Sequence, residues 1–255
     1  MKNLLVSVFL LAATTLTAQN VTSIFEFEST DEQSFKQVLD IWAPTLEKGL
    51  GQDLPPTYVF AEQGTRTYFF SQEFGSLSDW AAYQEKMEER DAEIGKAFQE
   101  SEMTPELFQS FNQSMNAHEL SLWKFMPELS TVDAFMEMSV EERDALPYRR
   151  ITYVKTDMNQ QNAFEEFIKK NHEMDARLGV EHIFAVYRSE TGARDVDYLM
   201  VVVDKSRFDY HRHWEARMKT RNADAEFQEA MQKMGSNPWT VVDEKHLMRI
   251  NELTY

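Results

Sequence analysis

Apolar and polar residues follow two different periods along this chain, and the periods succeed one another in the same order twice. Short β-rich runs, TSIFEFE and RRITYVKT, precede segments of helical periodicity that end near Gly49 and Gly179. Each segment is followed by two β-rich runs joined at EQGTR or SETGARD, which is typical of a hairpin. A second helix, opened by Ser76 or Ser206, and a last strand complete each half. This β-α-β-β-α-β order predicts a ferredoxin-like unit in each half.

The two halves also match residue by residue. The run SLSDWAAYQEKMEERDAEIGKAFQE (residues 76–100) aligns with SRFDYHRHWEARMKTRNADAEFQE (residues 206–229), which indicates an internal duplication. We therefore predict one unit over residues 20–129 and a second over residues 148–255. Residues 130–147 between them carry Ser139 and Glu142 at capping-box spacing and end at Pro147, which predicts a linker helix.

A ferredoxin-like unit leaves one face of its sheet bare, and the strand YLMVVVD is apolar on both faces. Each unit can cover the bare face of the other. The predicted fold is therefore α+β, with two tandem ferredoxin-like units whose antiparallel sheets pack as an intramolecular α+β barrel, a pseudo-dimer within one chain.

This element order, the duplication and the run FxxFxxxNHxxxxRLG (residues 164–179) resemble the dimeric α+β-barrel superfamily. That superfamily includes antibiotic-biosynthesis monooxygenase-like, NIPSNAP-like and EthD-like domains. The resemblance implies a small-ligand site between the sheet and the helices of a unit. The activities that it implies range from cofactor-free oxygenation and isomerisation to haem chemistry, or to none, so the fold leaves the reaction open.

The first 19 residues, MKNLLVSVFLLAATTLTAQ, have a lysine, a short apolar run and small residues in the order of a secretory signal peptide. We expect a periplasmic or secreted protein with no membrane span once the signal is removed, because the apolar run is short for a bilayer. An uncleaved anchor or a buried first helix is the alternative. The chain has no cysteine, so disulfides and thiolate metal sites are excluded.

The formal net charge is −17, which opposes binding to nucleic acid or to an anionic membrane surface. Basic residues are nevertheless concentrated in the second half, in YRRITYVK and HRHWEARMKTR. A local positive pocket on a negative protein can bind a small anion, so a small organic ligand is the expected partner.

The aligned helices differ where they should face the sheet. Four apolar or aromatic residues of the first half are replaced by polar ones in the second. The exchanges are Trp42 to Asn171, Leu46 to Asp175, Tyr83 to His213 and Met87 to Arg217. Because buried polar groups are costly unless paired, these residues should either pair with one another or face a cavity.

Two interpretations follow. In the first, the second half carries a pocket in which His213 is a catalytic acid or base. The ligand-binding residues would be Asn171, His172, Asp175, Tyr210, Trp214 and Arg217. In the second, Asp175 and Arg217 form an ion pair in a structural network and nothing reacts.

The leading functional hypothesis is an exported small-molecule-binding protein, with cofactor-free oxygenase or isomerase activity on a small anionic or carbonyl compound. The alternatives are a non-catalytic envelope binding or interaction module, and a haem-binding protein with His213 as the axial ligand. We expect no cofactor, with haem as the weaker alternative. We also expect no metal site, because no histidine pair has the helical spacing of one.

Overall fold

The structure is a computed structural model that describes residues 20–193, 195–234 and 239–253, apart from the side chains of residues 117, 118, 234 and 252. The expected signal peptide, residues 1–19, lies outside the described residues. No helix in the described ranges combines the length and the apolar character needed to cross a membrane.

From residue 20 on, the first half contains four strands and four helices before the chain crosses to the second half. The strands are β1 (Val21–Ser29), β2 (Thr57–Glu62), β3 (Thr67–Phe74) and β4 (Met115–Phe125). The helices are α2 (Glu32–Leu50), α3 (Leu77–Glu89), α4 (Asp91–Gln99) and α5 (Pro105–Ser114).

The second half follows a short crossover that contains η1 (Pro127–Leu129), α6 (Asp133–Glu137) and α7 (Val140–Asp144). Its strands are β5 (Tyr148–Thr156), β6 (Ile183–Thr191), β7 (Tyr198–Asp204) and β8 (Trp239–Arg249). Its helices are α8 (Gln161–Arg177), α9 (Arg207–Ala223) and α10 (Ala225–Met234), and η2 (Asn251–Leu253) follows β8.

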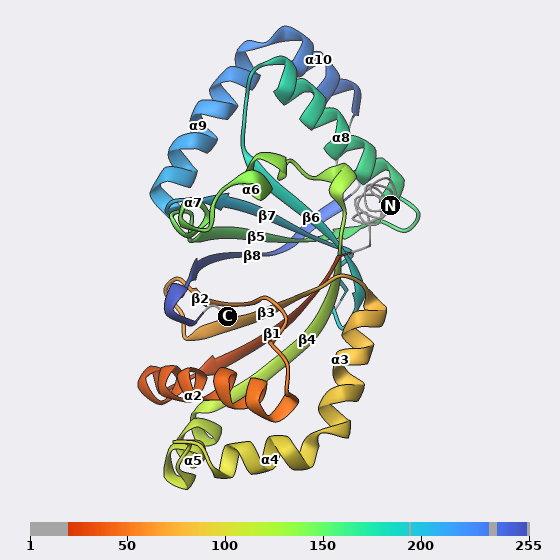
Figure 1. Ribbon diagram of the computed structural model, residues 1–255. Coiled ribbons are helices and arrows are strands. Elements are labelled where there is room, and N and C mark those ends of the chain that lie inside the picture. Colours follow the sequence, from red (N-terminus) through yellow and green to blue (C-terminus); the bar gives the residue numbers. More distant parts are fainter. Residues whose placement is uncertain (1–19, 194, 235–238, 254–255) are drawn as a thin grey trace, which may run out of the picture.

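The eight strands form one closed barrel in the order β1-β3-β2-β8-β5-β7-β6-β4. All the strand pairs are antiparallel, and the halves join where β2 pairs with β8 and where β4 pairs with β6. The helices lie outside the barrel, above and below the strands in Figure 1. The predicted α+β class and barrel are therefore confirmed.

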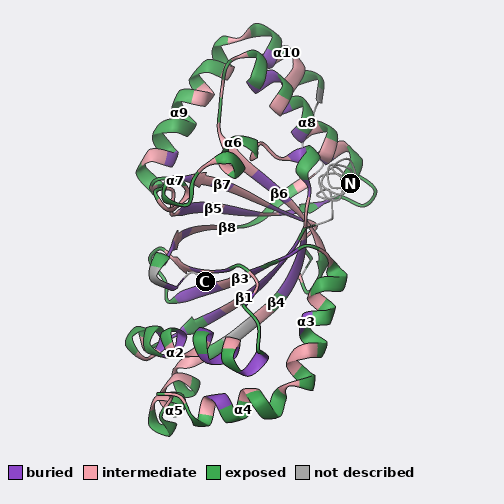
Figure 2. Ribbon diagram, viewed as in Figure 1, coloured by how far each residue is buried: buried purple, intermediate pink, exposed green. Residues whose placement is uncertain are grey.

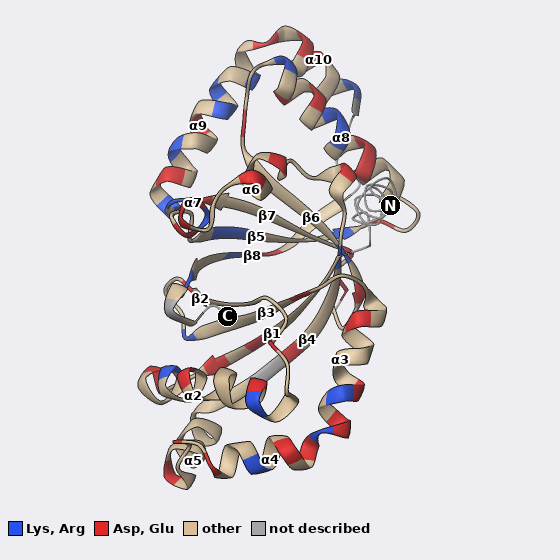
Figure 3. Ribbon diagram, viewed as in Figure 1, with Lys and Arg blue, Asp and Glu red and all other residues tan. Residues whose placement is uncertain are grey.

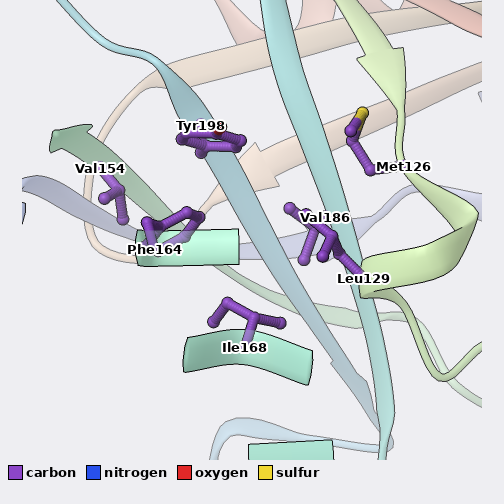
Figure 4. Packing of buried hydrophobic residues seen from close by; sticks show 7 residues of the cluster. All are labelled: Met126, Leu129, Val154, Phe164, Ile168, Val186 and Tyr198. Carbon is purple, nitrogen blue, oxygen red and sulfur yellow. The ribbon is translucent and has the colours of Figure 1, made fainter. Parts of the chain in front are cut away.

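Apolar residues under the helices hold each half together, and Figure 2 shows the buried positions along the strands and the inner sides of the helices. In the second half, α8 packs on the outer face of the sheet, where the ring of Phe164 lies 4.5 Å from that of Tyr198. Full burial of one such side chain contributes about 1.5–3 kcal/mol. The cluster, drawn in Figure 4, comprises Met126, Leu129, Val154, Phe164, Ile168, Val186 and Tyr198.

The helices depart from the prediction in three places. The second helix is broken in both halves, into α3 and α4 and into α9 and α10. The left-handed residue that ends α2 is Gly51 rather than Gly49. A Cβ on Gly49 would lie 2.6 Å from the Cα of Ile94, so this glycine instead allows α4 to approach α2 closely. The predicted linker helix is two short helices, the second of which has the expected capping box of Ser139 and Glu142.

Candidate functional site

Asp175, which the sequence singles out on α8, is buried in an ion pair between helices. Its side chain is 3% exposed, and Arg221 of α9 binds both of its oxygens, with Nε 2.7 Å from Oδ1. The expected partner was Arg217, one turn earlier on the same helix. Arg221 takes that place because its guanidinium meets the carboxylate edge-on with two donors, the strongest geometry for such a pair.

Arg217 and two histidines lie next to this ion pair. The Nε of Arg217 is buried without a hydrogen-bond partner, and burial lowers the pKa of this guanidinium. The pKa of His182 is lowered to about 3, first by burial and next by the charge of Arg217. Its Nδ1 lies 3.8 Å from Asp175, but Arg221 already neutralises that carboxylate. His182 and the adjacent His172, whose pKa is also lowered by burial, are therefore neutral near pH 7.

The buried neutral imidazole of His182 predicts a stability change in acid. The unfolded chain takes up the proton below a pKa of about 6.5, whereas the folded protein resists it until about pH 3. The free energy of unfolding should therefore fall as the pH drops below 6.5, with a contribution of up to about 1.4 kcal/mol per pH unit. Denaturant unfolding between pH 7 and 4 should show a shallower fall in His182→Gln. His211→Gln, at an exposed histidine, should keep the wild-type slope, and equal slopes in all three proteins would contradict the prediction.

The structure separates the other predicted site residues. Asn171 is buried, and its side-chain amide donates to the carbonyl oxygen of Phe167 in its own helix, 2.9 Å away. Tyr210 is buried against β5, with its ring 5.9 Å from that of Tyr148. The pocket interpretation required Asn171 and Tyr210 to face a common space with Asp175, and none of the three lines either of the two cavities described below.

His213 and Trp214 lie at the surface, contrary to the expected inner stripe. The His213 side chain is 56% exposed, with its Nδ1 2.8 Å from Oδ2 of Asp204, and Trp214 is 44% exposed. The reason is the course of α9, whose first turns lie close to the sheet and whose later turns rise away from it toward α10 (Figure 1). The catalytic role of His213 and the ligand-binding roles of its neighbours stay predictions.

A cavity of about 380 Å³ occupies one end of the barrel interior, between the two halves. Strands of both halves line it with apolar side chains, among them Phe69, Leu199 and Leu247. The crossover segment forms part of its wall, because Val132, Phe135, Met136 and Val140 border it. The segment that the sequence identifies only as a linker therefore helps to enclose this space.

Arg149 of β5 lines this cavity, and Figure 3 shows a basic segment on that strand. The residue is only 9% exposed, and its guanidinium lies between the rings of Phe60 and Phe135, at 5.8 and 5.7 Å. One of its nitrogens donates to the carbonyl oxygens of Leu146 and Tyr148. Within the part of the chain that the structure describes, no carboxylate pairs with it.

Burial, followed by the charge of nearby Arg249, lowers the pKa of Arg149 to about 10, so the group stays cationic near neutral pH. Arg249 lines the same cavity but has a partner, because its guanidinium lies 2.6 Å from Oδ1 of Asp144. A buried cation without a counter-charge is costly in a folded protein. The electrostatics of the site therefore favour a bound anion next to Arg149.

Further polar side chains border the cavity, among them Glu73, Tyr58 and Tyr187. Burial raises the pKa of the Glu73 carboxyl, against the opposing charges of Arg143 and Arg149. The phenols of Tyr58 and Tyr187 also have pKa values raised by burial, and so remain protonated hydrogen-bond donors. The cavity thus combines three arginines (Arg143, Arg149 and Arg249), neutral donors and two carboxyl groups (Glu73 and Asp144) within a mainly apolar wall.

Comparison with known proteins gives structural neighbours and no sequence relatives. No protein-family model matches the chain, and no curated protein matches it. An anthrone oxidase-like protein superposes with a TM-score of 0.50 at 12% identity, over 91% of this chain and 92% of that one. Chlorite dismutase from Candidatus Nitrospira defluvii, in complex with imidazole, superposes with a TM-score of 0.48 at 12% identity, over 95% and 97% of the two chains. The chain has the dimeric α+β-barrel fold.

This comparison corrects the expectation about cofactors. Chlorite dismutase-like neighbours point toward haem rather than toward the absence of a cofactor, so the prediction of no cofactor is wrong. The barrel cavity does not fit a haem, because no histidine with a described side chain lines it, and Met136, the methionine that borders it, is 62% exposed and so turns largely away from it. Its two tyrosines have raised pKa values, which disfavour a phenolate ligand. The described imidazoles whose pKa is lowered by burial, those of His172, His182 and His246, lie outside both cavities.

Proposed function

We propose that the protein binds a small organic anion with an apolar body inside the barrel, with the anionic group on Arg149. The observation that carries this proposal is the buried guanidinium of Arg149, which faces the cavity without a carboxylate partner among the described residues. A bound carboxylate would supply the missing counter-charge and pair with donors that the protein leaves free. The crossover would cover the ligand through Phe135.

The shape and lining of the cavity support an apolar body for this anion. Pockets of about 300–1,000 Å³ that are mostly apolar, with a few convergent polar groups, are the usual sites for small organic molecules. Among the polar groups here, Arg149, Arg143, Tyr58 and Tyr187 are donors suited to one anionic group. At the cavity itself three arginines face two carboxyl groups, so the local balance of charge is more positive than that of the chain as a whole.

Octanoate is a suitable probe, and octanamide is its neutral control. We expect calorimetric titration to give measurable binding of octanoate and at least a tenfold weaker affinity for octanamide, because the amide lacks the charge that Arg149 requires. Equal affinities would overturn the proposal, since the cavity would then select only an apolar body. A Soret band on addition of haemin that also appears in the Arg149→Met variant would assign haem to another part of the chain.

Glu73 predicts how this binding responds to pH. Burial raises its pKa in the folded protein, so the neutral acid favours folding, and that contribution is lost as the pH rises from the ordinary range of a glutamate through the raised pKa. The Glu73→Gln variant should be more stable than wild type at pH 8 and similar near pH 4. It should also bind octanoate about tenfold more tightly at pH 8, because it removes a like charge from the cavity.

Denaturant unfolding and octanoate titration at pH 4.5, 6 and 8 measure both effects. Glu62→Gln, at a carboxylate of β2 that does not line the cavity, is the control and should leave octanoate affinity unchanged. An affinity in Glu73→Gln that equals the wild-type value at all three pH values would show that Glu73 does not face the bound anion.

The strand order supports the finer description of the fold. Within each half the strands follow the order fourth, first, third, second, which is β4-β1-β3-β2 and β8-β5-β7-β6. That is the order of a ferredoxin-like unit, so we propose that the barrel consists of two such units related by duplication. The proposed ligand lies between the units rather than under the helices of one.

A further inference from the structure

We propose that Ile24 sets the longest ligand that the barrel accepts, because its side chain separates the cavity at Arg149 from a second cavity at the other end of the barrel. This inference rests on the proposed function and names the residue that would determine its specificity. The second cavity measures about 200 Å³. Among the lining residues of the two cavities, Ile24 is common to both.

A layer of apolar side chains crosses the barrel at this level. The residues of the layer are Ile24, Phe69, Trp123, Ile151, Leu199 and Leu247. Each of them lines one of the two cavities, so the layer closes the inner end of both. A ligand whose anionic group sits on Arg149 would therefore meet this layer with its far end.

Ile24 is the weak point of the layer because small residues flank it. On the neighbouring strands its direct partners are Ser71 and Ser121, and these serines line the first and the second cavity, respectively. The indole of Trp123 donates to the hydroxyl of Ser121 at 2.8 Å, which holds that large ring in place. Truncation of Ile24 should therefore open a passage that no neighbouring side chain is poised to fill.

The second cavity can take the end of a longer chain. Trp123, Tyr153 and Val242 give it apolar surface, and its one described cation, Lys245, is already paired with Glu26 at 3.1 Å. Because Lys245 is already paired with a carboxylate, this end of the barrel attracts an anion only weakly. The passage would thus extend an apolar tail rather than add a second anion site.

The test is a titration of straight-chain monocarboxylates of increasing length into wild type and Ile24→Ala. Each methylene that reaches apolar surroundings should tighten binding about fourfold until the chain meets the layer, after which affinity falls. In Ile24→Ala the rise should continue for at least two further methylenes, so that the first acid rejected by wild type binds at least tenfold more tightly to the variant.

Ile183→Ala is the matched control, because Ile183 lines the first cavity but does not belong to the layer. It should leave the length limit unchanged. If Ile24→Ala does not fold, Ile24→Val should shift the limit in the same direction by less.

The outcomes separate the two proposals. If the wild-type protein binds carboxylates and the Ile24 variants show the same length limit, the role of Ile24 is overturned and the proposed function is unaffected. A wild-type protein that binds none of the acids overturns the proposed function and this inference together. A limit that lengthens equally in Ile183→Ala would show that cavity size, rather than the passage at Ile24, determines length.

Discussion

Arg149→Met is expected to abolish octanoate binding and, at the same time, to stabilise the protein. The guanidinium is 9% exposed and has no carboxylate partner among the described residues, so folding buries an uncompensated charge. Replacing it with an apolar side chain of similar length should raise the free energy of unfolding by about 1–3 kcal/mol. Loss of a buried charge pair with the ligand should cost about 2–5 kcal/mol of binding, or roughly 30-fold to several thousandfold in affinity.

The adjacent residue provides the control. Arg150 points to the other face of β5, where it pairs with Glu244 and lies over the ring of Tyr210. Arg150→Met should lose some stability and keep the wild-type affinity for octanoate. Calorimetric titration and urea unfolding of the two variants measure both quantities. Equal loss of binding in both variants, or a large destabilisation of Arg149→Met, would contradict the assignment of Arg149 as the anion anchor.

The second large effect is expected at the ion pair between α8 and α9. Asp175→Asn should destabilise the protein by about 3–5 kcal/mol, because it leaves Arg221 buried without a counter-charge. The neighbouring Arg217 already has a buried nitrogen without a hydrogen-bond partner, so the variant would leave two unpaired cations together. Urea unfolding at pH 7 measures the loss.

An exposed ion pair on α10 gives the comparison. Glu229→Gln removes a partner of Lys233, both largely exposed, and should cost no more than about 0.5 kcal/mol. In double-mutant cycles, Asp175 should couple strongly with Arg221 and weakly with Arg217. Strong coupling between Asp175 and Arg217 instead would favour the ion pair that the sequence predicts and contradict Arg221 as the main partner.

The fold could be predicted because its signal is repeated. Strands and helices alternate with clear periods in both halves, Ser76 and Ser206 begin their helices as expected, and one duplicated unit with a bare sheet face needs another to cover it. The breaks at Arg90 and Asp224 were missed because both lie within runs that keep helical composition on either side.

The site was harder to predict because it depends on where the barrel is hollow. The sequence shows Arg149 and Arg150 as equivalent neighbours, and strand alternation places them on opposite faces without saying which face borders a cavity. Comparison of the halves drew attention to α9 instead. The comparison of the two halves correctly predicts that Asn171 and Asp175 of α8 are buried polar residues. Its error is to treat α9 as lying on the sheet along its whole length.

A crystal structure of the protein with octanoate would test the central claim most directly. We expect electron density for the acid inside the barrel, with both carboxylate oxygens within hydrogen-bonding distance of the Arg149 guanidinium and the tail directed toward Ile24. Density for the acid between α8 and α9, against Arg217 and His182, would contradict the account. An empty barrel at a concentration that saturates binding in solution would contradict it equally.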